Sequence, residues 1–192
     1  MTMGWYSLCI VIALCAICTL GKKHGGPDSA CSSLTPRHGN NTAQVSSSPY
    51  TIRVISATQY KRGTKVMLQL TGPAFQGVMI QARKKGSNAI VAGQFADFPP
   101  YTKAKKCTND ADTITHSAPD NKTNIEFSWN PPNQADGDIE FYGTVLQKFD
   151  TFWLEHKSAT LKPADDYKGS AGMLRIATAL LGLPVITMIL IF

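Results

Sequence analysis

The sequence predicts an all-β fold, an immunoglobulin-like β-sandwich with processing segments before and after it. Short segments of alternating apolar and polar residues recur from residue 50 to residue 154, separated by Gly, Pro and Asn. No helix of ordinary length is indicated between residues 22 and 168, which disfavours α/β scaffolds. About seven or eight short strands of this kind favour two packed sheets. With 192 residues, 43% of them hydrophobic, the chain has room for one domain with a full core.

Residues 1–21 are predicted to be a signal peptide. The apolar run Leu8–Leu20 is followed at once by a glycine and two lysines. Its length suits the core of a signal peptide and is short for a membrane span. We therefore expect the chain to enter the secretory pathway.

Removal of this leader would leave two cysteines of the original five. Cys15 and Cys18 have the spacing of a redox or metal-binding pair, but they lie inside the apolar run. In an oxidising compartment Cys31 and Cys107 most simply form one disulfide. That bond would close a loop of about 76 residues and, on the loop-entropy model, stabilise the fold by about 4 kcal/mol.

The folded domain is expected over residues 31–161, after a flexible Gly- and Lys-rich start at residues 22–30. Surface loops are expected at 39–48 and 99–107 because these segments are rich in Asn, Ser and Thr or in Pro and Lys. Period-two alternation predicts strands at 50–56, 65–71, 77–83, 89–95, 113–116, 124–129 and 138–147. The core candidates are Ile52, Val54, Val66, Leu68, Leu70, Val78, Ile80, Phe127, Trp129, Phe141 and Val145.

Six sequence blocks occur in a fixed order within this region: Cys31–Gly39, Ser48–Ile52, Gly77–Arg83, Thr113–Ser117, Gly137–Asp138 and Thr151–Trp153. Together they closely resemble the reeler (reelin amino-terminal) domain, over about Cys31 to Leu161. The resemblance implies an immunoglobulin-like sandwich that binds extracellular molecules and carries out no chemistry of its own.

Reeler domains occur in reelin, in the spondins, in ferric-chelate reductases ahead of a haem-bearing membrane domain, and alone in small insect defense proteins. Nothing in this chain resembles the cytochrome module of the reductases, so electron transfer is not implied. The chain is most similar to the single-domain defense type, with a hydrophobic tail added.

The C-terminal residues predict a membrane attachment. Residues 162–172 are expected to be a linker, in which Gly169 and Ser170 are candidate attachment sites for a GPI anchor. The tail at 173–192 is hydrophobic and ends without a following charge. It is either a GPI signal, although its polar spacer is short, or a retained membrane helix. Both alternatives place the domain on the extracellular face of the plasma membrane.

The residue types that could form a catalytic or metal site are scattered along the chain and match no known motif. No zinc-protease, nucleophile-elbow or phosphate-binding motif is present. His24, His38, His116 and His156 are not at ligand spacing, although His38 and His116 could be considered as a metal pair. Asp136, Asp138 and Glu140 favour an acidic turn over a calcium loop, because the twelve-residue pattern is absent. We expect no enzyme activity, no cofactor and no bound metal.

Basic clusters are the best candidates for ligand binding in the sequence. The chain carries 19 basic and 13 acidic residues, a net charge of +6. Three clusters fall in predicted turns or loops and could converge on an anionic glycan, lipopolysaccharide or anionic lipid, or could simply form a solvated rim. Nucleic acid is not expected as a partner of an exported protein without a reading motif. The cluster residues are Lys61, Arg62, Lys65, Arg83, Lys84, Lys85, Lys103, Lys105 and Lys106.

Two asparagines, Asn40 and Asn121, stand in acceptor sequons for N-glycosylation within predicted loops. The sequence as a whole predicts an extracellular recognition module, of the kind used in innate defense. The alternatives are a matrix or adhesion module that binds another extracellular protein, and an accessory to ferric-reductase-type redox systems.

Overall fold

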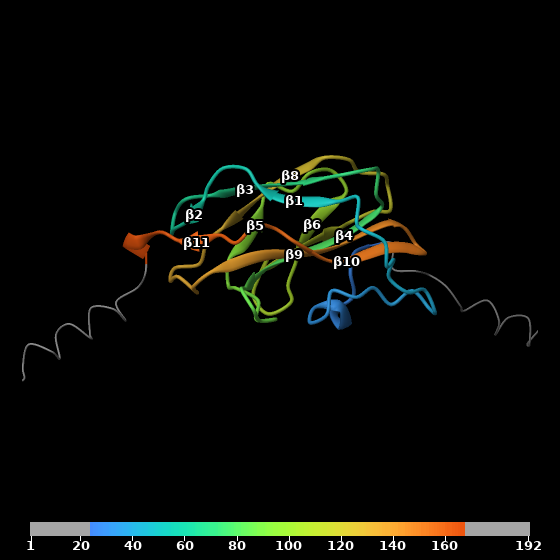
Figure 1. The fold of residues 1–192 in the computed structure, drawn as a ribbon, viewed down its shortest axis with the longest axis horizontal. Helices are drawn as coiled ribbons and strands as arrows, with labels where there is room; N and C mark the ends of the chain where they lie inside the picture. The colour runs from blue at the N-terminus through green and yellow to red at the C-terminus, as the bar shows by residue number, and fades with distance from the viewer. Residues whose placement is uncertain (1–23, 168–192) are drawn as a thin grey trace, which may run out of the picture.

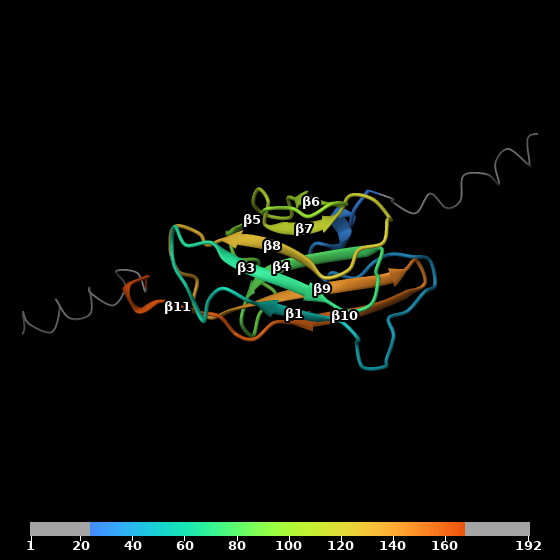
Figure 2. The same cartoon turned by 90° about the horizontal axis from the view of Figure 1, so that it is seen from above.

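The computed structural model describes residues 24–167, which form two facing β-sheets (Figures 1 and 2). One sheet has the strand order β1-β3-β8-β5 and the other β10-β9-β4-β7-β6, and β11 pairs with β2 in a separate two-stranded sheet. The predicted all-β fold is confirmed. The expected signal peptide, Gly169, Ser170 and the hydrophobic tail lie outside the described residues.

Eleven strands and two short 3-10 helices make up the described part of the chain. They are η1 (Asp28–Ala30), β1 (Thr51–Val54), β2 (Gln59–Tyr60), β3 (Val66–Thr71), β4 (Gly77–Lys84), β5 (Gln94–Ala96), β6 (Thr102–Lys105), β7 (Thr113–His116), β8 (Ile125–Asn130), β9 (Ile139–Lys148), β10 (Thr151–Lys157), β11 (Lys162–Pro163) and η2 (Asp165–Tyr167).

The β4–β9 pair is the central ladder of the five-stranded sheet. Its antiparallel register runs from Gly77 opposite Leu146 to Lys84 opposite Ile139. Strand β10 returns along β9 with a register shift between Trp153 and His156. All strand pairs in the two large sheets are antiparallel, whereas β11 and β2 are parallel.

The core lies between the two large sheets and is rich in aromatic residues. Trp129 meets Phe141 edge to face at a centroid distance of 5.5 Å, and Tyr60 approaches Trp129 from another side at 5.7 Å. Ten of the eleven predicted core residues are buried, and Val54 is only partly buried at the end of β1. The alternation of the sequence therefore identifies the inward faces of these strands correctly.

Residues 89–95 do not form the strand that the sequence predicts. Ala89 and Val91 bond to the backbone of β4, and the chain then crosses to the facing sheet, where Gln94 begins β5 beside β8. Gly93 lies at this crossing against Trp129, and an added Cβ would be 2.3 Å from the indole ring. The apolar run is thus divided between two sheets, and glycine is required where its backbone passes the tryptophan.

Part of the expected loop at 99–107 is the edge strand β6, which pairs with β7. Its residues are exposed or partly buried on both faces, so the strand lacks the apolar alternation that would reveal it in the sequence, and its lysines are typical of an edge. The short strands β2 and β11 and the strand β10 extend the predicted set of seven or eight strands.

Candidate functional site: two cavities beside an N-terminal strap

Residues 24–38, here called the strap, lie against the outer face of the five-stranded sheet (blue in Figure 1). Ala30 and Leu34 are 2% and 4% exposed, and they pack with Met79 and Tyr142 in a second small core. The flexible start expected at residues 22–30 is therefore wrong from His24 onward. This segment covers apolar surface that the sheet would otherwise present to water.

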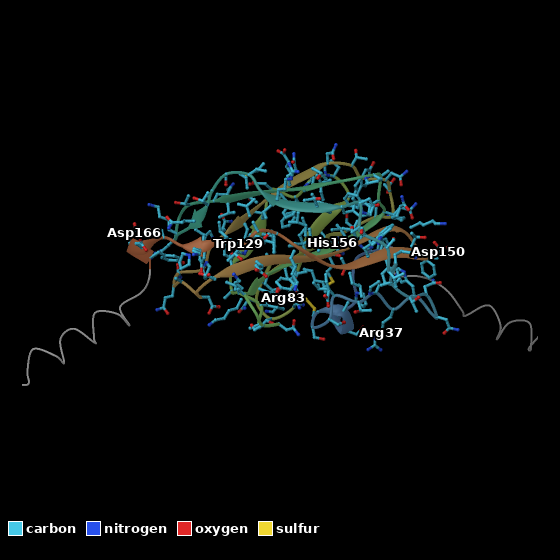
Figure 3. The ribbon with its side chains drawn as sticks, in the orientation of Figure 1. Arg37, Arg83, Trp129, Asp150, His156 and Asp166 are labelled. Atoms are coloured by element: carbon cyan, nitrogen blue, oxygen red, sulfur yellow. A yellow bond between two sulfur atoms is a disulfide. The ribbon has the colours of Figure 1, made fainter. Side chains whose placement is uncertain are left out.

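The predicted disulfide joins the strap to the sheet and appears as the yellow bond in Figure 3. Cys31 and Cys107 have a Cα–Cα distance of 5.5 Å and lie 76 residues apart in sequence. The Cys107 side is held by Asp112, whose buried carboxylate accepts the backbone N–H groups of Cys107, Thr108 and Asn109 at 2.9, 2.7 and 2.6 Å. Three such bonds compensate the burial of a carboxylate.

Arg83 holds the Cys31 side of the strap. Its Nη2 donates to the carbonyl oxygens of Cys31 and Ser32 at 3.2 and 2.8 Å, and its Nε donates to Gln81 Oε1 at 2.9 Å. The Gln81 amide donates in turn to Cys31 O and to Thr113 Oγ1, both at 3.1 Å. Burial lowers the pKa of the Arg83 guanidinium from its ordinary value, and Tyr142 opposes this shift.

These contacts form a hydrogen-bonded relay from Arg83 to Cys107. Gln81 contacts Thr113, and the Thr113 hydroxyl donates to Asp112 Oδ1 at 3.0 Å. A buried cation and a buried anion thus stand at opposite ends of a chain of neutral groups. Such a network is favourable because each of these polar groups has a partner.

The binding of an anion by the three basic clusters stays a prediction, and their residues differ in environment. Arg83 is 3% exposed and serves the relay. Most of the lysines instead face aspartates. The ion pairs of these lysines are Lys61–Asp166 (3.8 Å), Lys65–Asp97 (2.7 Å), Lys84–Asp136 (3.7 Å), Lys105–Asp28 (2.5 Å) and Lys106–Asp110 (2.9 Å). Partial neutralisation of each cluster by its own neighbours weakens its attraction for an external anion.

A polar cleft lies on one side of the strap. Its volume is about 520 Å³, and its lining combines serine, threonine, amide and charged groups with an aromatic ring. Arg83 Nη1 donates to Asn88 Oδ1 at 3.1 Å. Of the lining residues, Lys157 lies 4.8 Å from the centroid of the Tyr142 ring. The lining residues are Ser32, Ser33, Leu34, Thr35, Arg83, Gly86, Ser87, Asn88, Tyr142, Leu154, Glu155 and Lys157.

An apolar pocket of about 330 Å³ lies on the other side of Leu34, between the strap and the beginning of β4. Ala30, Leu34, Val78, Met79 and Leu146 provide its apolar lining. The three ionisable side chains of the lining are Arg37, His38 and His116, all basic. Figure 3 shows Arg37 projecting outward from the strap.

Two histidines that are far apart in sequence thus line one pocket. The His38 Nδ1 donates to Phe149 O at 2.7 Å, and its ring stacks on Phe149. His116 Nδ1 lies 3.3 Å from Val78 O. Burial lowers the pKa of His116, opposed by its contact with Val78 and reinforced by neighbouring positive groups including Lys122. Within residues 24–167 no cluster of three or more potential metal ligands is present.

The sequence analysis singled out Cys31, Cys107, Arg83 and the pair His38 and His116, but not the other residues that line the two cavities. Ser32, Ser33, Ser87 and Asn88 are common loop residues, and only the fold brings them to Arg83. Asn40 and Asn121 are exposed, and their glycosylation stays a prediction. The expected domain boundaries also stay a prediction.

A two-sheet sandwich whose outer face is covered by a disulfide-linked N-terminal strap defines the class of this protein. The Reeler domain family model matches residues 29–167, so the chain belongs to the Reeler domain family. The fold is similar to the crystal structure of the human F-spondin reeler domain, with a TM-score of 0.54, 20% identity and coverage of 70% of this chain and 99% of that one.

Two curated relatives differ in length. The chain is 32% identical over 159 residues to "Putative ferric-chelate reductase 1" of Danio rerio, covering 80% of this chain but only 27% of the reductase. It is 29% identical over 160 residues to "Putative defense protein Hdd11" of Hyphantria cunea, covering 80% of this chain and 95% of that protein. In the described range of 24–167, no helix has the length and apolar character needed to cross a membrane.

Proposed function

We propose that this protein is an extracellular, membrane-tethered recognition protein that binds an anionic glycan in the polar cleft beside the strap. A role in innate defense is in keeping with its insect relatives. The observation that carries the proposal is the composition of the cleft, where hydroxyl, amide and cationic groups converge around a tyrosine ring. Planar and polar faces together are suited to a sugar with an acidic substituent.

Each part of the cleft has a role in this proposal. Arg83 is 3% exposed and donates to protein acceptors, so it adds positive potential to the wall of the cleft and orients Asn88 through Nη1. Exposed Lys157 provides a mobile positive charge near Tyr142. Glu155 also lines the cleft, and its carboxylate would accept hydrogen bonds from ligand hydroxyl groups, which favours a sugar over a bare anion.

The test is the binding of a heparin-derived tetrasaccharide to the full-length protein and to a Lys157→Gln variant. Loss of the cleft cation should raise Kd about threefold to tenfold, and added salt should reduce this difference. Lys162→Gln is the matched control, because Lys162 is also exposed but lies on β11, away from the cleft. Equal effects of the two variants would overturn the assignment to the cleft.

A neutral dextran of similar size separates charge recognition from general sugar binding. We expect no measurable binding of dextran at concentrations that saturate with the sulfated probe. Lipopolysaccharide can be tested with the same two variants. Similar Kd values for dextran and for the sulfated tetrasaccharide would contradict the requirement for an anionic group.

A further inference from the structure

The apolar pocket on the other side of Leu34 has a different chemistry from the polar cleft. The floor consists of aliphatic and thioether groups, and Met79 and Leu146 are 4% and 9% exposed. Its volume of about 330 Å³ is at the lower end of the range for small-molecule sites, roughly 300 to 1,000 Å³. It is also about twice the size of an engineered cavity of ~150 Å³ that binds benzene. A single alkyl chain of medium length therefore fits this pocket better than a sugar.

The ionisable side chains that line the pocket are all basic. Arg37, His38 and His116 line it, and no Asp or Glu does. Asp28, the carboxylate nearest in sequence within the strap, pairs with Lys105 at 2.5 Å. Arg37 is exposed and forms no ion pair with another of residues 24–167.

Arg37 supplies the positive charge at the mouth of the pocket, and a hydrogen bond orients the adjacent His38 ring. Because a carbonyl oxygen only accepts, the proton of the His38 ring is on Nδ1, which donates to Phe149 O at 2.7 Å. This bond fixes the ring beside Arg37 on the strap. An apolar floor and a mouth with the positive charge of Arg37 together match an amphiphile with an anionic head group.

We propose that this pocket binds a free medium-chain fatty carboxylate, with the alkyl chain against Met79 and Leu146 and the carboxylate at Arg37. The assignment is independent of the glycan site, because the two cavities share only Leu34. A carboxylate and an exposed arginine form a bidentate pair whose strength falls with salt.

The structure provides two methyl reporters for a direct test. In residues 24–167 the methionines are Met67, on β3 of the facing sheet, and Met79, in the pocket. The full-length protein is labelled with [methyl-¹³C]methionine, Met79→Leu assigns the signal, and decanoate is added below its micelle concentration. We expect a saturable shift of the Met79 methyl signal and an unchanged Met67 signal. No shift of Met79, or equal shifts of both signals, would overturn the proposal.

Changes of the ligand test its two halves. Octanoate, two methylenes shorter, should bind roughly tenfold more weakly if the chain is buried in the pocket. Decanol has the same chain without the charge and should also bind more weakly. Equal affinity of decanol and decanoate would overturn the assignment of an anionic ligand, and a Met79 shift with phosphatidylglycerol vesicles alone would overturn the assignment of a free carboxylate.

A change of the protein tests the head group. Arg37→Glu should weaken decanoate binding about fivefold or more, because it replaces an attractive charge at the mouth with a repulsive one. Arg53→Glu is the matched control, because Arg53 is exposed on β1 of the facing sheet. An unchanged Kd in Arg37→Glu, with wild-type Met79 and Met67 signals in the free protein, would contradict the proposed position of the carboxylate.

Discussion

Strands β3 and β4 belong to facing sheets, and their side chains are buried in different patterns. In β3 buried Val66, Leu68 and Leu70 alternate with partly buried residues, as expected for a strand with one face toward water. In β4 every residue from Gly77 to Arg83 is buried. The strap makes this difference, because it covers the outer face of the five-stranded sheet near β4 and leaves the outer face of β3 to solvent.

The difference shows why the two cavities lie where they do. A sheet face that is merely exposed offers a flat surface, whereas a short segment placed over a sheet leaves hollows along its edges. Outward-facing Gln81 and Arg83 on β4 are partners of the strap, while outward-facing Gln69 on β3 pairs with Glu126 at an exposed site. Residues with similar chemistry therefore have structural roles on one face and surface roles on the other.

Among the changes considered, removal of the disulfide should have the largest effect on stability and on the difference between the covered and exposed sheet faces. The double variant Cys31→Ala, Cys107→Ala should lower the free energy of unfolding by about 4 kcal/mol, because the unfolded chain regains the entropy of a long loop. Chemical denaturation measures this loss. Amide exchange should accelerate in the strap more than in β3, because the strap can then open locally. Equal acceleration in both would show that the strap has no separate opening.

Removal of the Arg83 side chain should have the next largest effect. Arg83→Met leaves the carbonyl groups of Cys31 and Ser32 without their donor, which should cost about 2 to 4 kcal/mol in the free energy of unfolding. Arg53→Met on the exposed face of β1 is the control and should change stability by less than ~0.5 kcal/mol. Similar losses in the two variants would contradict the contrast between covered and exposed faces.

Acidification should have the smallest effect on the free energy of unfolding. Burial lowers the pKa of both His116 and His156 in the folded state, while a histidine in the unfolded chain titrates near ~6.5. Below that pH the unfolded state binds more protons than the folded state. The contribution of these histidines to stability is therefore constant above ~6.5 and falls as the pH decreases toward their folded-state pKa values. Each unit of pKa difference corresponds to about 1.4 kcal/mol.

Histidine NMR titrations can separate the two environments. His156 is 7% exposed and packs beside Tyr50, whereas His116 lies in the pocket under the strap. In the cysteine double variant the pKa of His116 should therefore move back toward its ordinary value, and that of His156 should stay low. Equal movement of both values would mean that the core, and not the strap alone, has loosened.

The sequence predicted the fold class, the disulfide and most of the core, because these depend on local alternation and on cysteine count. It did not predict that β4 is covered on both faces, since Gln81 and Arg83 look like ordinary solvent-facing residues of a half-buried strand. The cavities depend on contacts between the strap and residues some 50 positions later, such as Gln81 and Arg83. No local pattern encodes such contacts.

The run Arg83, Lys84 and Lys85 shows the limit of reading charge from sequence. Lys84 and Lys85 are exposed, but Arg83 is buried in the preceding strand position. Alternation alone predicts that the Arg83 side chain points to the outer face of the sheet, and this is correct. Only the tertiary structure shows that the strap covers this face.

The relay from Arg83 to Asp112 also bears on how the protein matures. Arg83 and Gln81 hold the backbone at Cys31, and Asp112 holds the backbone at Cys107, all without use of the sulfur atoms. These contacts favour a position of the strap that holds the two thiols close, which would raise their effective concentration. We expect oxidation to join two thiols that docking of the strap has already placed together.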